Sequence, residues 1–370
     1  MRSIEKYIAK KEDLIEFIND KKFKRIFVIT GNNSYRNSGA EKILQNVFFK
    51  KEVFFYFKRK FLPELNELKK IHLYCKKIKP DLIITIGGGA VLDYAKIANI
   101  LDDLTNIEQK IKKYSYPIKK KKYKLIAIPT TAGSGAEATS NAVIYLNSVK
   151  YSFEDKLLIP DYFFLIPELV IKVPKKIKSS SGFDAIAQSM ESIISLKSTP
   201  ESILFAKQSL KLSIDYFAQY LAKPSLNNSK FMSLASHLAG KAINISKTTA
   251  PHAVSYPFSS LYKISHGHAV SLTFNKFLKF NFVNSKYSIS SFDLKSRYDI
   301  FFEIFKVDNI DDLIFKLDIL KKNASLEDNY KKLGINIDRN IDKFLRDINM
   351  LRLKNNPIKL QKNDIKNIIL

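Results

Sequence analysis

The sequence Asp81-Leu-Ile-Ile-Thr-Ile-Gly-Gly-Gly-Ala90 decides how this chain is organised. Its first half is apolar and rich in β-branched residues, which is typical of a strand buried on both faces. Three glycines follow at once, and a helical pattern runs from Val91 to about Leu101. A glycine backbone at a helix N-terminus can bind a pyrophosphate, although this is not the GxGxxG spacing. A tight turn without any ligand is the alternative interpretation.

Similar apolar runs flank this unit and alternate with helical segments. Further strands are predicted at residues 25–30, 53–57 and 123–129, and a helix at 65–77. This alternation is typical of a parallel sheet covered by helices on both faces. After about Pro167 helical patterns dominate, as at residues 182–196, 200–221, 229–246 and 310–322. We therefore predict an α/β domain with a Rossmann-like parallel sheet at residues 1–167 and an all-α domain at 168–370.

A second polar loop, Pro129-Thr-Thr-Ala-Gly-Ser-Gly-Ala-Glu137, also follows a predicted strand. Hydroxyl groups and backbone amides beside glycines can bind a phosphate, a ribose or an amide edge. In open α/β sheets, ligands bind at the carboxyl ends of the strands, so two such loops there predict a nucleotide site. A Gly-Ser loop without a role is the alternative for this stretch by itself.

The second half of the chain contains a candidate metal site. Asp184 and Gln188 are four residues apart and so lie one turn apart on one helical face. His252 and His266 follow, and with His268 they are three of the five histidines in the chain. A carboxylate, two imidazoles and an amide oxygen can hold a divalent metal with one position open. Singly, such an Asp is usually a helix cap and such a His a core residue.

The composition argues against several other classes of protein. The net charge of +26 comes almost wholly from scattered lysines, without the interleaved aromatics of a nucleic-acid surface, so no nucleic-acid partner is expected. The single cysteine, Cys75, excludes an intrachain disulfide and fits a reducing compartment. Residues 1–17 lack a signal-peptide core, and no stretch approaches ~20 apolar residues. We expect a cytoplasmic protein without a membrane segment.

Together these motifs resemble the iron-containing (group III) alcohol dehydrogenase family. The family's Gly-Gly-Gly-Ser-x-x-Asp-x-x-Lys is similar to residues 87–96, and its Pro-Thr-Thr-x-Gly-Thr-Gly-Ser-Glu to residues 129–137. Its Asp-Ala-x-x-His-x-x-Glu is similar to residues 184–191, and its two metal histidines correspond to His252 and His266. Residues 355–357, Asn-Asn-Pro, resemble its C-terminal turn.

The resemblance implies a dehydroquinate synthase-like fold, with a dinucleotide-binding domain at residues 1–167 and a helical metal-binding and catalytic domain at 168–370. Fe²⁺ or Zn²⁺ would be held by Asp184, His252 and His266, with Gln188 as fourth ligand or bystander, and would polarise an aldehyde that NADPH or NADH reduces. His268 would be a proton relay or substrate contact, with a structural surface histidine as the alternative. The cofactor-binding residues would be Gly31, Ser34, Gly87, Gly88, Gly89, Ala90, Asp93, Thr130, Thr131, Gly133 and Ser134.

The chain departs from the family pattern at three places. Ala90 and Ala136 replace small hydroxyl residues, which leaves the backbone of both loops. Gln188 replaces a metal-binding histidine, and its amide oxygen is a weaker, harder ligand than imidazole. Residues 30–34 offer no carboxylate for the adenosine ribose, so Ser34 and Arg36 would be donors to a 2′-phosphate, and we expect NADPH to be favoured over NADH.

A narrower resemblance concerns the substrate. Residues 191–202, 247–257 and 266–269 are similar to the phosphonoacetaldehyde reductase branch, which makes 2-hydroxyethylphosphonate. The anionic phosphonate would be bound by Lys197–Thr199 and Lys247–Thr249, which an ordinary helix end and polar loop explain equally well. The alternatives are a general alcohol or polyol dehydrogenase of the same family, or a metal-free cofactor-binding protein. Family members also suggest a homo-oligomer.

Overall fold

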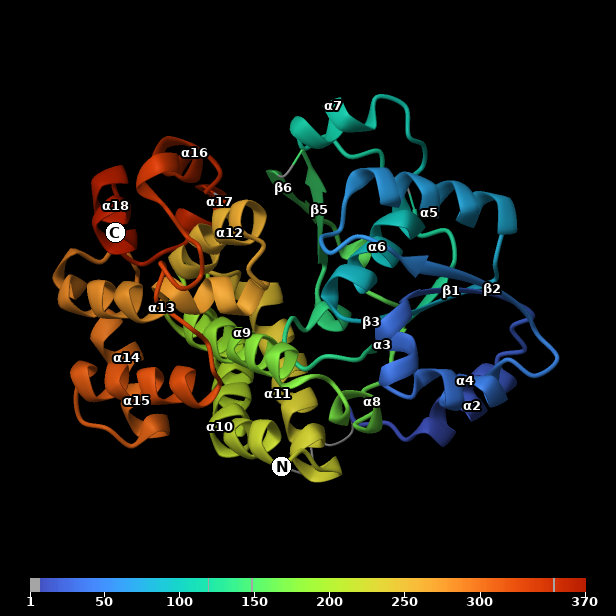
Figure 1. Ribbon diagram of the computed structural model, residues 1–370, viewed down its shortest axis with the longest axis horizontal. Helices are drawn as coiled ribbons and strands as arrows, with labels where there is room; N and C mark the ends of the chain where they lie inside the picture. Colours follow the sequence, from blue (N-terminus) through green and yellow to red (C-terminus); the bar gives the residue numbers. More distant parts are fainter. Residues whose placement is uncertain (1–6, 119, 148, 349) are drawn as a thin grey trace. The chain divides into compact units, whose positions relative to one another are not determined.

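The computed structural model describes residues 7–118, 120–147, 149–348 and 350–370 (Figure 1). The chain forms two compact units: unit 1 runs up to Val173 and includes Pro224–His237, and unit 2 consists of Pro174–Lys223 and Leu238–Leu370. Compared with the predicted domains, residues 168–173 and 224–237 lie with unit 1. The expectation about a signal peptide falls partly on residues 1–6, outside the described residues.

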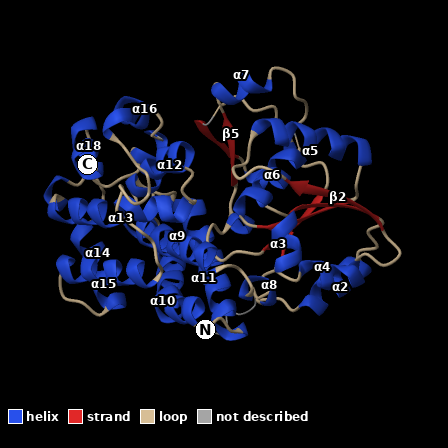
Figure 2. Ribbon diagram, viewed as in Figure 1, coloured by secondary structure: helices blue, strands red, loops and turns tan. Residues whose placement is uncertain are grey.

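Unit 1 is built on a parallel sheet of five strands in the order β2-β1-β3-β4-β7 (Figure 2). The strands are β1 (Arg25–Gly31), β2 (Glu52–Lys58), β3 (Leu82–Gly87), β4 (Lys124–Pro129) and β7 (Tyr162–Phe163). This confirms the predicted Rossmann-like sheet. The register sets Gly31 opposite Lys58 and Gly87 opposite Pro129, so four strands end nearly level at one edge.

Helices cover both faces of this sheet because successive strand residues point to opposite sides. Phe27 and Ile83 pack with α5 (Leu65–Ile78) and α6 (Gly89–Ile100) on one face. Ile26 and Ile84 lie in the core of the other face. There they meet α2 (Lys11–Asp20), α3 (Asn32–Asn37), α4 (Ala40–Val47) and α8 (Glu168–Ile171), and Figure 1 shows α2 and α4 across the sheet from α5.

The sequence analysis missed an antiparallel hairpin, β5 (Asn141–Leu146) and β6 (Val149–Glu154). Its Ile144 and Phe153 join the apolar core on the α5–α6 side of the sheet. The pattern is visible in Val149-Lys-Tyr-Ser-Phe, where apolar and polar residues alternate, but it lacks the continuous apolar run of the predicted strands. Unit 1 also contains α7 (Ile107–Lys112) and short 3-10 turns at Ala136–Ala138 and Lys156–Leu158.

Unit 2 is helical, as predicted. Its central helix is α9 (Lys175–Ile194), which is buried almost continuously from Lys178 onward and packs against α10 (Pro200–Ala222). A capping box at Thr199 and Ser202 starts α10. The other helices are α11 (Leu226–Ser246, in unit 2 from Leu238), α12 (Ala250–Tyr262), α13 (His266–Val283), α14 (Leu294–Phe305), α15 (Ile310–Asn323), α16 (Ile341–Arg346), α17 (Met350–Leu353) and α18 (Lys362–Ile369), with 3-10 turns at Ser285–Tyr287 and Asp338–Asn340. Among the described residues, none of the helices has the length and apolar character needed to cross a bilayer.

Asn355 joins three parts of unit 2 that are distant in sequence. Its side-chain Nδ2 donates to Ser195 Oγ at 2.8 Å, to the Ser246 carbonyl at 2.9 Å and to the Thr248 carbonyl at 3.0 Å. Its backbone carbonyl accepts from the N–H of Leu196 at 3.1 Å. The loop after α9 and the loop before α12 are therefore fixed together by one buried amide.

His72, on α5, makes the stability of unit 1 depend on pH. Its Nδ1 lies 3.4 Å from the Ala98 carbonyl, and burial, followed by the charge of Lys122, lowers the pKa of His72 to about 4. In the unfolded chain His72 takes up this proton near the ordinary value of 6.5. The contribution of neutral His72 to the free energy of unfolding is therefore fully present above pH 6.5, and it is lost as the pH falls from 6.5 towards 4. The loss is roughly 3 kcal/mol, at 1.4 kcal/mol per pKa unit.

We expect His72→Gln to remove this part of the acid sensitivity, because glutamine keeps a donor for Ala98 and does not titrate. Urea unfolding of both proteins at neutral pH and near pH 4 measures it. An equal loss of stability in parent and variant would assign the acid sensitivity to other groups.

Candidate metal and nucleotide sites

Three predicted metal ligands come together in unit 2. Ligand atoms of Asp184, His252 and His266 all lie within 4.8 Å of one another. Asp184 Oδ1 is 3.2 Å from His252 Nε2 and 3.8 Å from His266 Nε2. Asp184 and His252 are buried, whereas the side chain of His266 is 36% exposed, which leaves one side of the cluster open. The three residues come from α9, α12 and the first position of α13.

Gly267 allows α13 to approach α9 closely enough for this cluster to form. A Cβ atom at Gly267 would lie 1.9 Å from the backbone oxygen of Ser180 and 2.9 Å from Asp184 Cβ. No side chain can be accommodated there, because the first obstacle is backbone. The glycine beside His266 is thus required by the packing of two helices.

Gln188 lies beside the cluster, one turn after Asp184. Its Nε2 donates to Asp184 Oδ2 at 3.1 Å. Its Oε1 is buried and finds no hydrogen-bond partner among the described residues. A buried acceptor without a donor costs free energy. A cation bound at this oxygen would supply the missing partner. Two imidazoles, a carboxylate and this amide oxygen suit a divalent metal.

Glu191 is a site residue that the sequence analysis quoted only within a motif. Its Oε1 lies 2.7 Å from His252 Nδ1, and its Oε2 accepts from the Thr249 N–H at 2.6 Å. Burial lowers the pKa of His252, but Glu191 and Asp184 outweigh it and raise the pKa to about 10. Carboxylates of this kind orient metal-binding histidines. The available signal was spacing: Glu191 follows Asp184 by seven residues, two turns on the same face.

His268 does not point into the cluster. Its ring Nε2 lies 2.6 Å from the backbone carbonyl of Glu327, and its backbone N–H donates to Ser180 Oγ at 3.1 Å. Burial lowers the pKa of His268. The contacts are those of a histidine that joins two segments of unit 2, so the predicted proton relay has no geometric support.

The two predicted nucleotide loops of unit 1 lie against each other. The N–H of Thr130 donates to the Gly87 carbonyl at 3.0 Å. A Cβ atom at Gly88 would lie 3.3 Å from Thr131 Oγ1, and one at Gly89 would lie 2.8 Å from Ser134 Oγ. The remaining predicted members, Ala90 and Gly133, belong to the same two segments, and α6 begins at Gly89. The two loops thus form one backbone-lined surface suited to a dinucleotide.

Asp93, one of the predicted cofactor-binding residues, has partners within unit 1. Burial raises the pKa of Asp93 to about 6. Nearby Lys96 and a hydrogen bond from the Val143 backbone act in the opposite direction and lower it. One turn later, Lys96 is fully buried and donates to the carbonyls of Ala136 at 2.9 Å and Thr139 at 2.8 Å. The polar side of α6 therefore holds the end of the second loop.

Gly31 is the last residue of β1, and Ser34 lies in α3, which follows directly. The Ser34 hydroxyl donates to the Gly31 carbonyl at 3.0 Å, which closes the turn into α3. That hydroxyl is thereby occupied locally and is not the free donor that the sequence suggested.

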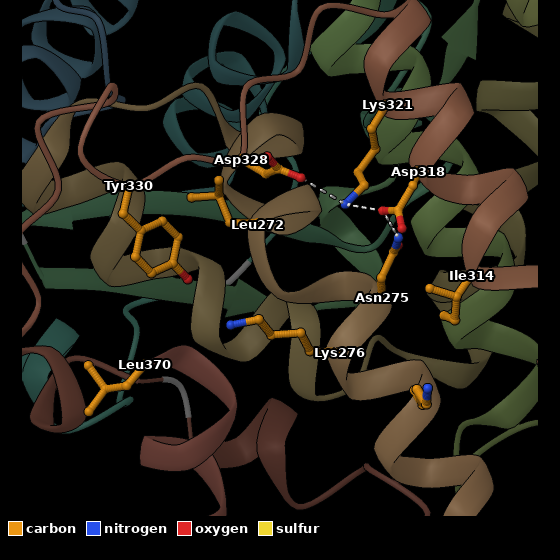
Figure 3. A pocket seen from close by; sticks show the side chains of 10 residues that line it. Leu272, Asn275, Lys276, Ile314, Asp318, Lys321, Asp328, Tyr330 and Leu370 are labelled. Carbon is orange, nitrogen blue, oxygen red and sulfur yellow. Dashed lines mark hydrogen bonds and ion pairs between the residues drawn. The ribbon is translucent and has the colours of Figure 1, made fainter. Parts of the chain in front are cut away.

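A cavity of about 440 Å³ in unit 2 contains none of the predicted site residues. Figure 3 shows Lys321 pointing to Asp318 and Asp328, with distances of 3.0 and 3.7 Å. Asn275 donates to the same Asp318 at 2.6 Å. These polar groups are largely satisfied by one another.

Comparison with known proteins identifies what this arrangement is similar to. The sequence model described as "Iron-containing alcohol dehydrogenase" matches residues 6–167, and the one described as "Fe-containing alcohol dehydrogenase family, C-terminal" matches residues 178–370. A phosphonoacetaldehyde reductase of Streptomyces viridochromogenes is 30% identical over 217 residues, 56% of this chain and 54% of that protein. A long-chain-alcohol dehydrogenase of Geobacillus thermodenitrificans is 29% identical over 215 residues, 56% and 53% of the two chains. The chain thus spans about half the length of these curated relatives.

Solved structures show the same fold. Sulfoacetaldehyde reductase from Bifidobacterium kashiwanohense, in complex with NAD⁺, superposes with a TM-score of 0.85 at 23% identity, over 98% of this chain and 95% of that one. An alcohol dehydrogenase from Oenococcus oeni gives a TM-score of 0.86 at 22% identity, over 97% and 95%.

Proposed function

The chain belongs to the iron-containing alcohol dehydrogenase family, and from that premise we propose that it reduces an aldehyde to a primary alcohol with a divalent metal and a nicotinamide dinucleotide. The observation that carries the proposal is the cluster of Asp184, His252 and His266, whose ligand atoms lie within 4.8 Å of one another. Two further observations support it: Glu191 lies within hydrogen-bonding distance of His252 Nδ1, and the buried Oε1 of Gln188 has no hydrogen-bond partner among the described residues.

Each residue has a stated task in this proposal. Asp184, His252 and His266 would hold Fe²⁺ or Zn²⁺, with Gln188 Oε1 as the fourth donor. A bound metal would supply Lewis-acid polarisation of the aldehyde oxygen, and a bound reduced nicotinamide would supply the hydride. Glu191 fixes the ring of His252 so that Nε2 faces Asp184. The loops at residues 87–90 and 130–134 hold the dinucleotide.

For the substrate, we propose a small aldehyde that carries an anionic group, such as phosphonoacetaldehyde. Two similar proteins are named as reductases of a phosphonate and a sulfonate aldehyde. In unit 2, Asn355 fixes Ser195 to Thr248, which brings the segments of Lys197–Thr199 and Lys247–Thr249 together. Thr249 also bonds Glu191, the partner of His252. Cationic and hydroxyl groups near the cluster favour an anion.

The test is NADPH and NADH oxidation by metal-loaded protein with phosphonoacetaldehyde, and with propanal as the neutral comparison. We expect turnover of the phosphonate and a roughly tenfold higher KM in Lys247→Ala, because one charge-assisted contact contributes about 1.5–3 kcal/mol. Lys211→Ala, an exposed lysine on α10, is the matched control and should behave like the parent.

The outcomes separate the alternatives. Turnover of propanal alone would keep the dehydrogenase and exclude the anionic substrate, which favours a general alcohol dehydrogenase. Nucleotide binding without turnover, with any metal, would support a cofactor-binding protein without activity. We also propose that the protein is cytoplasmic and forms a homo-oligomer. Light scattering measures the mass of the assembly.

A further inference from the structure

A cavity in unit 1 is lined by cations that the sequence analysis, Arg36 apart, did not single out. It has a volume of about 500 Å³. Its lining residues are Asn32, Arg36, Phe57, Lys58 and Arg59. Three of the five are cationic and none is acidic. A site of this charge, in the size range of small-ligand pockets, suits an anion.

The position of this cavity relates it to the nucleotide loops. Lys58 is the last residue of β2 and lies opposite Gly31 in the register of the sheet. β1 pairs on its other side with β3, whose last residue is Gly87. Two strand spacings, about 10 Å, thus separate the cationic end of β2 from the glycine turn. A dinucleotide with its pyrophosphate at Gly87–Gly89 and its nicotinamide towards Thr130 would extend its adenosine towards β1 and β2.

The backbone of the segment that carries Arg59 is fixed by hydrogen bonds to Glu67. The buried carboxylate of Glu67 accepts from the N–H groups of Arg59 at 2.6 Å and Lys60 at 3.2 Å, and from the Tyr94 hydroxyl at 2.9 Å. Lys58 Nζ donates to the Phe61 carbonyl at 3.1 Å. The backbone is therefore held in place while Arg59 is an exposed residue. Such support is what a binding residue on a loop requires.

The choice of arginine is informative in this chain. The sequence has 62 cationic side chains, of which only eight are arginine, and two of those eight line this one cavity. Guanidinium groups bind phosphate oxygens in bidentate fashion, which lysine cannot do. Phe57 adds an exposed ring on which an adenine base can stack.

We infer that Arg36, Lys58 and Arg59 form a subsite for a phosphate on the adenosine ribose of the cofactor, and that Lys58 and Arg59 make this chain select NADPH over NADH. The inference rests on the proposed dehydrogenase function and specifies its cofactor. The Ser34 hydroxyl, expected from the sequence to bind this phosphate, donates to Gly31 instead. The inference assigns that role to cations at the end of the neighbouring strand.

Binding of NADPH, NADH and 2′,5′-ADP to the full chain, measured by calorimetry, tests the subsite without turnover. We expect the parent to bind NADPH at least about tenfold more tightly than NADH. Arg59→Ala should weaken NADPH and 2′,5′-ADP by about tenfold to a hundredfold and NADH by less than about twofold, as expected for one charge-assisted phosphate contact. Lys60→Ala, the adjacent exposed lysine outside the cavity, is the matched control and should change neither.

Three results would overturn the inference, and they are distinguishable. Equal binding of NADPH and NADH by the parent removes the subsite and leaves the dehydrogenase proposal standing. Equal weakening by Arg59→Ala and Lys60→Ala reduces the effect to general surface charge. Binding of no nicotinamide nucleotide contradicts the dehydrogenase proposal itself.

Discussion

Replacing Asp184 by Asn is expected to lower metal affinity and kcat/KM by about 10³-fold. Asp184 Oδ1 lies 3.2 and 3.8 Å from the two imidazoles, and its Oδ2 accepts from Gln188. Among the described residues of this cluster, Asp184 is the carboxylate that lies next to the rings of both His252 and His266. Asparagine keeps the shape and removes the charge. Changes to residues that only support metal ligands cost about 10- to 100-fold, so loss of an anionic ligand should cost more.

Metal content after dialysis against Fe²⁺ or Zn²⁺, measured by elemental analysis, is a readout independent of activity. Asp311→Asn, an exposed carboxylate of unit 2 that pairs with Lys279, is the control and should retain the metal. If D184N bound as much metal as the parent, Asp184 would not be a ligand and the assignment of the cluster would be wrong.

The second large effect is expected for Gly267→Ala. The added methyl group would lie 1.9 Å from the Ser180 carbonyl oxygen, so α13 has to move away from α9. Overpacking a core typically costs 1–3 kcal/mol, and a backbone obstacle places this site at about 3 kcal/mol. We expect the thermal transition of unit 2 to fall by roughly 6–12 °C, at 2–4 °C per kcal/mol, and bound metal to be lost with it.

The control for this substitution is Gly334→Ala in the same unit. Gly334 has a φ of +68°, and a methyl group added there would have no atom within 4 Å, so alanine costs only backbone strain, about 1 kcal/mol. Similar losses in the two variants would show that strain, and not the helix contact, explains the effect of G267A.

The sequence was sufficient for the features that rest on local pattern. The strand, glycine turn and helix at residues 81–101 formed as predicted because apolar β-branched residues and glycines act within a few positions. The metal candidates were found because few histidines exist and the spacing of Asp184 and Gln188 is helical. Hairpin β5–β6 was missed because polar residues interrupt the apolar run of β6, and only packing on α6 reveals the role of the hairpin.

What could not be predicted depends on partners from distant segments. Asp93 was predicted to contact the cofactor, but in the structure it lies beside Lys96 and forms a hydrogen bond with the Val143 backbone. His268 stands beside His266 in sequence, yet its ring faces the Glu327 carbonyl. Arg59 had no motif at all, and only the register of β2 against β1 places it near Gly31. A sequence specifies donors and acceptors, whereas the tertiary fold decides which of them meet.

The contacts of Asn355 have a consequence for how the protein is synthesised. This residue stands 160 positions after Ser195 and 109 after Ser246, both of which accept from its side chain. Chains emerge from the ribosome N-terminus first, at about 5–20 residues per second. The helices that carry Asp184 and His252 therefore leave the ribosome before the amide that fastens their loops. During that interval, of the order of ten seconds, unit 2 is an incomplete bundle with apolar surface uncovered, and chaperones would have their main opportunity to bind it.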